Sequence, residues 1–256
     1  MFIETHCHLD YLKALPLEEI RAKIKEAGIT KVITIGVDPL NLDKVRELSM
    51  TYEEIYYTQG IHPHDAKEAT EVEFEKISTR SIEKKMVAVG EIGLDYHYNN
   101  SPPEIQRTVF EKQLQLAVDY DLPVVIHTRD ADEDTKAILK NFSSKLKRKG
   151  VVHSFTSSRE LAEFVLGEGF YLGFNGIITF KKAENVQEVV KITPAEQILF
   201  ETDSPFLTPV PHRGKENAPY FLPFVASKIA ELKNLDLENL KRQVYTNSLQ
   251  CFHKLS

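Results

Sequence analysis

Two histidines near the amino terminus are spaced for metal binding. His6 and His8 lie at the end of the segment Phe2–Asp10, which begins with apolar residues and is typical of a short strand. Successive side chains of a strand point to opposite faces, so His6 and His8 share one face and Cys7 points to the other. Two imidazoles on one face can bind one divalent metal ion. The pair alone is a weak indication, and it gains weight from similar residues elsewhere in the chain.

Further histidines and carboxylates follow segments that have the composition of buried strands. A lone histidine is often a packed core residue whose nitrogens are satisfied, whereas a group of them at comparable positions is characteristic of a metal centre. The candidate ligands of this kind are His6, His8, His62, His64, Glu91, His127, His153 and Asp203. His97 and His212 fall in loops that follow two of the same segments.

Histidines and carboxylates contributed by several strands suit a centre with two divalent metal ions. Glu91 is the natural bridging residue, because each of its two oxygens can contact one ion. Asp203 can bind an ion with one oxygen and accept a proton from the attacking water with the other. Two ions about 3.5–4 Å apart lower the pKa of a bound water toward about 7, which is the machinery of a hydrolase. Histidine-rich ligation favours Zn, Mn, Fe or Co over Mg, but the sequence does not distinguish these ions.

The segments that position these residues alternate between strand and helix patterns. Runs rich in β-branched residues predict strands at 2–8, 31–37, 55–60, 86–93, 123–127, 151–153, 170–175 and 198–203. Amphipathic stretches predict helices at 16–27, 41–50, 71–84, 104–120, 132–142, 159–167, 183–191, 220–232 and 237–253. Longer loops are expected at 94–103 and 204–219, and the last helix is expected to pack on the outside.

Eight strand-then-helix units in a chain of this length indicate a parallel sheet closed into a (β/α)8 barrel, the TIM barrel. A doubly wound open sheet is the alternative, although the sequence has no glycine-rich phosphate loop of the Rossmann or Walker kind. No linker or low-complexity segment interrupts the chain, so residues 1–256 are expected to form a single domain. In such a barrel the active site lies at the carboxyl ends of the strands, where the candidate ligands fall.

Composition narrows the class of protein further. The formal net charge of −6 argues against broad, charge-driven binding of nucleic acid, although bound metal ions can still attract a phosphate substrate. No apolar run is long enough to cross a membrane, and no secretory signal is evident. The two cysteines, Cys7 and Cys251, give no indication of a disulfide framework. We therefore expect a cytoplasmic protein that needs no membrane and no obligate protein partner.

Short motifs spread along the chain carry a family resemblance. They are Thr5–Asp10 (THCHLD), Gly60–His64 (GIHPH), Gly90–Tyr96 (GEIGLDY), Pro123–Arg129 (PVVIHTR), His153–Phe155 (HSF), and Glu201–Pro205 (ETDSP) with Pro211–Gly214 (PHRG). In this order they resemble the TatD family of metal-dependent hydrolases, which are described as deoxyribonucleases within the wider group of amidohydrolase-like barrels. The motifs span almost the whole chain and together are highly specific.

The resemblance implies roles for individual residues. One metal ion would be bound by His6, His8, Glu91 and Asp203, and a second by Glu91, His127 and His153. His62 would face the scissile phosphate, and Asp203 would orient or deprotonate the attacking water. The implied substrate is the phosphodiester of a DNA or oligonucleotide end, cut with 3′-to-5′ exonuclease polarity. Two positions depart from the family pattern: Glu4 stands where Asp is frequent, and Ser157 stands where glycine is common.

Several residues on the same face are candidate contacts to substrate. They are His62, His64, Arg129, Arg213, Tyr96 and Phe206. Arginine pairs well with phosphate, although an ordinary salt bridge is the alternative. Tyrosine and phenylalanine can stack on bases, although loop aromatic residues more often pack against protein. The basic run 145–149 precedes the sixth predicted strand, so we expect it at the opposite end of the barrel as a solvated charged face.

Two other functions stay open. The same metal centre can hydrolyse an ester, a lactone or an amide. Related barrels often bridge their metal ions with a modified lysine, and Glu91 at the equivalent place favours the TatD-like branch. A non-enzymatic metal-binding or scaffold protein on a barrel fold is the third hypothesis.

Overall fold

The computed structural model describes residues 1–98 and 100–256, and in this part of the chain eight parallel strands alternate with helices. The strands are β1 (Phe2–Cys7), β2 (Ile29–Thr34), β3 (Ile55–Gln59), β4 (Met86–Asp95), β5 (Val124–Arg129), β6 (Gly150–Val152), β7 (Tyr171–Phe174) and β8 (Ile198–Phe200). The helices are α1 (Leu17–Glu26), α2 (Leu42–Thr51), α3 (Glu71–Arg80), α4 (Pro103–Asp119), α5 (Asp132–Phe142), α6 (Arg159–Gly167), α7 (Glu184–Ile192), α8 (Leu222–Lys233) and α9 (Leu237–Cys251). The loop predicted at 94–103 includes residue 99, which lies outside the described residues.

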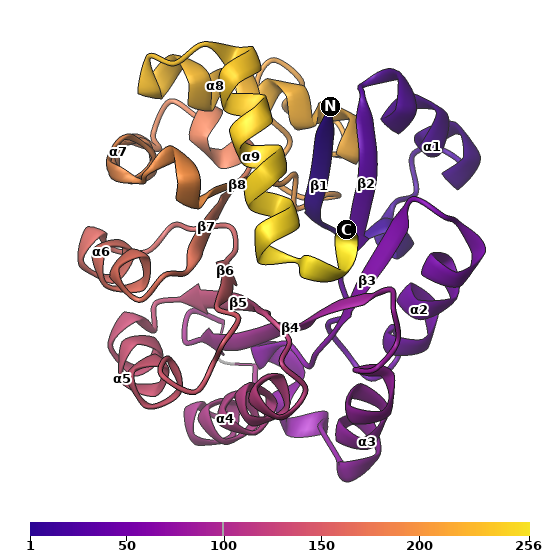
Figure 1. The fold of residues 1–256 in the computed structure, drawn as a ribbon, viewed down its shortest axis with the longest axis vertical. Coiled ribbons are helices and arrows are strands. Elements are labelled where there is room, and N and C mark those ends of the chain that lie inside the picture. Colours follow the sequence, from indigo (N-terminus) through magenta and orange to yellow (C-terminus); the bar gives the residue numbers. More distant parts are fainter. Residues whose placement is uncertain (99) are drawn as a thin grey trace.

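The strands follow one another around the sheet in sequence order, and each pairs in parallel with the next. Figure 1 shows helices α1 to α8 as an outer ring around these strands. A parallel bridge between Cys7 and Ser204 joins the first strand to the segment that follows the last one. The predicted (β/α)8 barrel is therefore confirmed, and the doubly wound sheet is excluded because its strand order would reverse.

The side chain of Glu4 completes the junction between β1 and β8. Its Oε1 accepts hydrogen bonds from the backbone N–H groups of His6 and Thr202, both at 3.0 Å. Direct backbone bonds continue the junction, since Asp203 N–H donates to the carbonyl of His6 (2.9 Å) and His8 N–H donates to that of Ser204 (2.8 Å). These bonds fix the ends of two strands that each carry candidate metal ligands.

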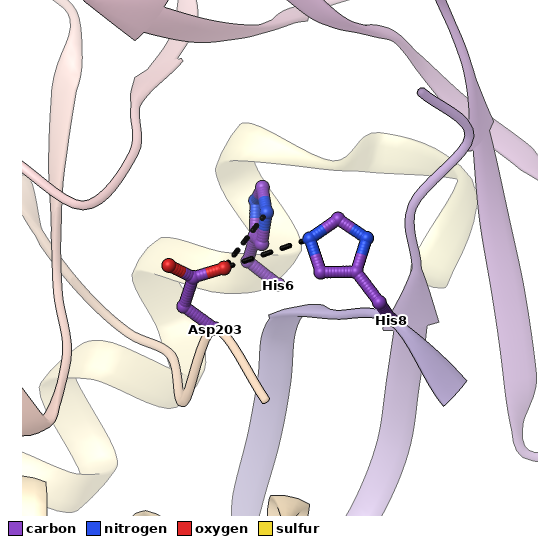
Figure 2. A group of neighbouring side chains, drawn as sticks. All are labelled: His6, His8 and Asp203. Carbon is purple, nitrogen blue, oxygen red and sulfur yellow. Dashed lines mark ion pairs between the residues drawn. The ribbon is translucent and has the colours of Figure 1, made fainter. Parts of the chain in front are cut away.

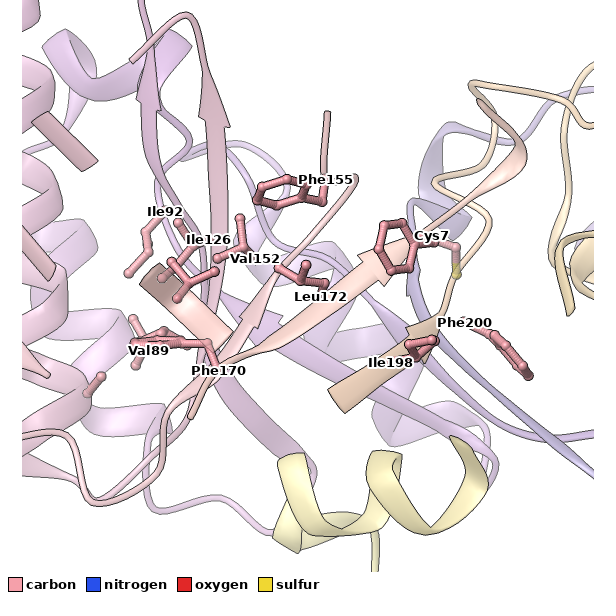
Figure 3. Packing of buried hydrophobic residues seen from close by; sticks show 14 of the residues in the cluster. Cys7, Val89, Ile92, Ile126, Val152, Phe155, Phe170, Leu172, Ile198 and Phe200 are labelled. Carbon is pink, nitrogen blue, oxygen red and sulfur yellow. The ribbon is translucent and has the colours of Figure 1, made fainter. Parts of the chain in front are cut away.

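The core has two layers that follow the alternation of side chains along each strand. In β5, Val124 and Ile126 pack outward against the helices, whereas Val125 points into the barrel. Figure 3 shows part of the outer layer, in which Ile126 lies near Val152 and Phe155. By the same alternation, the next inward position after Val125 belongs to the candidate ligand His127 at the carboxyl end of the strand.

The last helix differs from the sequence-based expectation that it packs only on the outside. Helix α9 contacts β1 and β8, and the residues after it cross the end of the barrel that faces the viewer in Figure 1. Phe252 and Leu255 are buried in the interior cluster, and Nζ of Lys254 donates to the carbonyls of Ser81 and Glu83, just before β4. The chain terminus therefore closes the amino-terminal end of the barrel and leaves the carboxyl ends of the strands as the open face. Across residues 1–98 and 100–256, no helix combines the length and the apolar character of a membrane span.

Candidate metal centre

The predicted ligands come together at the carboxyl ends of the strands. His6 lies within β1, Glu91 within β4 and His127 within β5. The others lie within three residues after the end of a strand. The residues that gather there are His6, His8, His62, Glu91, His127, His153 and Asp203, and most of them are buried. The alternation of side chains and the parallel register of the strands thus bring side chains nearly 200 positions apart into one cluster.

Glu91 is at the centre of this cluster. Its Oε1 lies 2.8 Å from Nε2 of His153, 3.1 Å from Nδ1 of His127 and 3.4 Å from Nε2 of His62. Its other oxygen, Oε2, lies 3.4 Å from Nε2 of His6. Burial opposes ionisation of this carboxyl, but the surrounding histidines outweigh burial and hold the pKa of Glu91 well below its ordinary range. An ionised carboxylate therefore presents one oxygen to each side of the cluster.

Asp203 faces the two histidines of the first strand. Its Oδ1 lies 3.5 Å from Nε2 of His8 and 3.7 Å from Nε2 of His6, as Figure 2 shows. The backbone of Asp203 has φ of +56°, a left-handed conformation that aspartate tolerates better than most residues. Burial raises the pKa of Asp203, but His8 and His6 outweigh burial, so the pKa is lowered and the carboxylate is ionised at neutral pH.

Unpartnered nitrogens show that these residues fit a metal ion. Among the described residues, neither ring nitrogen of His6 has a hydrogen-bond partner, and Nδ1 of His8 and Nδ1 of His153 have none. Buried polar atoms without partners are costly, so Nε2 of His6, which faces both Glu91 and Asp203, is suited to hold a cation. Three groups have potential ligand atoms within 4.8 Å of one another: His6–His8–Asp203, His62–Glu91–His127, and His6–His153–Glu201. The first group contains Asp203 and the second contains Glu91, the two carboxylates that the sequence singled out.

Asp95 holds His127 of the cluster and the neighbouring His64 in place by hydrogen bonds, a role that the sequence patterns did not predict. Its Oδ2 accepts hydrogen bonds from Nε2 of His127 and Nε2 of His64, both at 3.0 Å. Burial lowers the pKa of His127, but the bonds to Asp95 and Glu91 outweigh it and raise the pKa to about 9. The sequence offers one hint of such a residue, a carboxylate two positions after the predicted apolar strand 86–93, but not its partners.

Two further buried carboxylates lie beside the ligands. Glu201 is fully buried, and its Oε1 accepts a hydrogen bond from Ser154 N–H (2.6 Å) and lies 3.9 Å from Nδ1 of His153. Burial raises the pKa of Glu201 well above its ordinary value, and burial raises the pKa of Glu4 to about 8. The sequence patterns predicted no role for either residue, because burial depends on the assembled barrel.

The candidate ligands other than His6 line a cavity of about 690 Å³ that opens at the carboxyl face. Its wall also contains His64, Arg129, Tyr11, Tyr98, Phe206 and Leu207. A second cavity of about 880 Å³ adjoins it and shares Arg129 and Thr156. Its wall includes the acidic side chains Asp130, Asp132, Glu133 and Asp134.

The predicted substrate contacts lie at different distances from the ligands. His62, His64, Arg129 and Phe206 line the cavity of the candidate ligands. Tyr96 lies in the adjoining cavity, where its hydroxyl donates to Asp134 (2.6 Å), and the exposed Tyr98 occupies the nearer position instead. Arg213 lies in the loop after β8, with Cζ 3.9 Å from the centre of the Phe180 ring. His97 pairs with Asp130 and His212 stacks on Phe221, so neither joins the cluster.

Comparison with known families and proteins shows that the chain is similar to metal-dependent hydrolases. The family model described as TatD related DNase matches residues 3–253. The Bacillus subtilis protein YabD, named an uncharacterized metal-dependent hydrolase, is 40% identical over 253 residues, which cover 98% of this chain and 99% of YabD.

Two more relatives extend the comparison. A protein of Erwinia tasmaniensis named 3′-5′ ssDNA/RNA exonuclease TatD is 33% identical over 242 residues, covering 92% of this chain and 93% of the relative. The crystal structure of YjjV, a TatD homologue of Escherichia coli K12, superposes with a TM-score of 0.91 at 30% identity and covers 98% of both chains. Both similarities extend over more than nine tenths of this chain.

Proposed function

Because this chain belongs to the TatD family of metal-dependent hydrolases, we propose that it is a deoxyribonuclease that removes nucleotides from the 3′ end of a DNA strand. The position of Glu91 carries the proposal, since its two oxygens lie between histidines on either side. The relative named as a 3′-5′ exonuclease on ssDNA and RNA supports the choice of substrate. The proposal treats residues 1–256 as one catalytic domain.

Two divalent ions are proposed at the cluster. His6, His8, Glu91 and Asp203 would hold one ion, and Glu91, His127 and His153 would hold the other. Bound there, the ions supply a water of lowered pKa and neutralise charge on the phosphate. We do not assign His62 to an ion, although its Nε2 lies 3.4 Å from Glu91, because its side chain also lines the cavity in which a phosphate would lie.

The chain's own residues supply the proton transfer and the positioning. Asp203 is ionised at neutral pH and therefore accepts the proton of the attacking water. Burial lowers the pKa of His62 to about 4, so its imidazole is neutral and can donate one hydrogen bond to a phosphate oxygen. His64, Arg129, Arg213 and Tyr96 are the proposed contacts farther along the substrate.

The test is cleavage of a single-stranded oligonucleotide labelled at its 5′ end, by protein loaded in turn with Mg, Mn, Zn, Co or Fe. A ladder that shortens from the 3′ end is the expected result. The matched variant is Asp203→Asn, because asparagine keeps the shape of the side chain and also tolerates the left-handed backbone. Cleavage that persists at the wild-type rate in this variant would assign the activity to another centre or to a contaminant.

One observation favours a second candidate, hydrolysis of an ester, lactone or amide at the same centre. The cavity beside the cluster is lined by Asp130, Asp132, Glu133 and Asp134, and such a wall repels a polyanion but admits a neutral substrate. Assaying the same metal-loaded protein on phosphodiesters and on neutral esters and lactones separates the two. Activity confined to the neutral substrates would overturn the nuclease proposal and retain the centre.

A further inference from the structure

Basic side chains gather on one side of the metal cavity. Lys181 and Lys182 lie in the segment between β7 and α7, and Arg213 and Lys215 lie in the loop after β8. All four are at least partly exposed, and none forms an ion pair with a carboxylate in the described part of the chain. On a protein of net charge −6, a group of unpaired cations on one rim is a local exception to the general charge.

Contacts between the two loops place Arg213 beside the segment that carries Lys181 and Lys182. Val210 N–H donates to Oγ1 of Thr179 (2.9 Å), and the guanidinium of Arg213 stacks on the ring of Phe180. Ile177 and Leu207, from the same two loops, line the metal cavity itself. We call the surface formed by Lys181, Lys182, Arg213 and Lys215 the basic ledge.

An aromatic side chain lies between the basic ledge and the ligands. Phe206 belongs to the same loop as Arg213, is 52% exposed and lines the metal cavity. Its ring centre is 6.0 Å from that of His8, so it reaches the edge of the cluster. Exposed aromatic rings beside unpaired cations form the combination that binds single-stranded nucleic acid, because cations track the phosphates and rings stack on the bases.

A rim beside the metal cavity, at the adjoining cavity, carries the opposite charge. Asp130, Asp132, Glu133 and Asp134 precede or begin α5 and line the adjoining cavity, whose wall also includes Arg159 and reaches Glu188 of α7. Asp130 pairs with His97 and Asp134 with Arg107, whereas Asp132 and Glu133 form no ion pair in the described part of the chain. Arg129 is the cation that both cavities share. Repulsion between this acidic rim and a phosphate acts only on a strand that continues past the centre in that direction.

From this asymmetry we propose that a single strand of nucleic acid reaches the centre across the basic ledge, and that the acidic rim stops it one nucleotide beyond the scissile phosphate. The inference rests on the proposed function and adds the direction of the strand and a physical reason for cutting at an end. The ledge binds the uncut part of the chain through phosphates and bases. The acid-lined cavity accommodates the terminal nucleotide, which carries no phosphate beyond the scissile one. A strand that continues in that direction is repelled at its next phosphate.

The first experiment measures binding without cleavage. Binding of a fluorescein-labelled thymidine oligonucleotide of about twenty bases is followed by anisotropy in EDTA, over a range of salt concentrations, for wild type and for Lys181→Glu/Lys182→Glu. We expect the variant to bind at least about tenfold more weakly. The slope of log K against log salt should fall by about 0.7 for each phosphate that the variant no longer neutralises.

The matched control is Lys145→Glu/Lys147→Glu, which makes the same change in charge on exposed residues just before β6, at the other end of the barrel. This control is expected to bind as wild type does. If binding is weakened equally in both double variants, the effect is explained by net charge, and the proposed role of the basic ledge is contradicted. Unchanged binding in Lys181→Glu/Lys182→Glu would also overturn it.

The second experiment measures cutting by the metal-loaded protein. The ratio of kcat/KM on the long oligonucleotide to that on a dinucleotide is expected to fall in Lys181→Glu/Lys182→Glu, because the dinucleotide does not reach the ledge. Glu133→Lys weakens the acidic rim and is expected to increase nicking of circular single-stranded DNA, which has no end. A wild type that cuts oligonucleotides while both measurements stay unchanged contradicts the strand path alone. A wild type that binds at the ledge but cuts no phosphodiester contradicts the proposed function alone.

Discussion

Oδ2 of Asp95 lies 3.0 Å from Nε2 of His127, while the other ring nitrogen of His127, Nδ1, lies 3.1 Å from Oε1 of Glu91. The imidazole is therefore held between an outer carboxylate and the central one. An outer carboxylate that accepts a hydrogen bond from a ligating histidine fixes the ring orientation and raises its basicity. Asp95 is almost fully buried, so water does not replace this bond when the carboxylate is removed.

Asp95→Asn is expected to weaken metal binding by about 10- to 100-fold, because the amide offers no negative charge to the imidazole. Isothermal titration of metal-free protein with Mn or Zn measures the affinity. The control is Asp119→Asn, an exposed residue of α4 that accepts a hydrogen bond from Gln115 and lies outside the candidate centre. Equal metal affinities in Asp95→Asn and wild type would contradict the claim that Asp95 strengthens metal binding through His127.

Metal binding at neutral pH is expected to release about one proton from His127. With its pKa raised to about 9, His127 is protonated in the metal-free protein at neutral pH, and it must lose that proton to bind an ion. Burial lowers the pKa of His8, but Asp203 outweighs burial and raises it, so His8 adds to the release. His6 and His62, whose pKa values burial lowers to about 4, are already neutral and release none. The release therefore decreases as the pH rises through about 9.

Titrations in buffers of different ionisation enthalpy measure that release. In Asp95→Asn the pKa of His127 should fall, so fewer protons should be released at neutral pH than in wild type. A release that is the same at pH values well above and well below 9 would contradict the assignment to His127.

The barrel could be predicted from the sequence because each strand and helix carries its own local pattern. The differences are at the ends of elements: β4 continues to Asp95, and α3 stops at Arg80 instead of near residue 84. The position of the chain terminus was not predictable in this way. An amphipathic pattern identifies the apolar face of α9, but it does not say that Phe252 packs into the barrel interior.

The candidate site could be predicted where a residue's type and its position near the end of a strand are enough to place it. Alternation along the strands places His6, His8 and His127 on the interior face, and the structure brings them together. The roles of Asp95 and Glu201 depend on burial and on partners from other strands, which no single segment encodes. The assignment of the histidines, Glu91 and Asp203 as metal ligands, and of Asp95 as a support of His127, stays a prediction.

Glu4 is expected to stabilise the junction of β1 and β8. Glu4→Ala leaves the buried N–H groups of His6 and Thr202 without an acceptor, which costs roughly 2–5 kcal/mol of unfolding free energy. Glu4→Gln keeps an oxygen at this position and should lose much less. Urea unfolding of the metal-free proteins measures both changes, and equal losses in the two variants would contradict the role of this oxygen.

Stability should also depend on pH through Glu4. Burial raises its pKa in the folded protein from 4.5 to about 8, so the folded state retains a proton that the unfolded chain has released. The contribution of Glu4 to stability is complete below pH 4.5 and is lost as the pH rises to about 8, by up to about 1.4 kcal/mol per pH unit. Relative to wild type, Glu4→Gln should therefore become more stable over this range, whereas parallel pH profiles would contradict the prediction.

Phe252→Ala is expected to destabilise the protein by about 3–5 kcal/mol, although the residue lies close to the end of the chain. The ring is fully buried against the barrel interior, where Ile3, Val87 and Leu199 belong to the same cluster, so truncation leaves a cavity that the rigid strands cannot fill. The matched control is Leu235→Ala, a residue that is 42% exposed and should change stability little. Urea unfolding compares the two, and a small loss for Phe252→Ala would show that the barrel floor does not depend on the chain terminus.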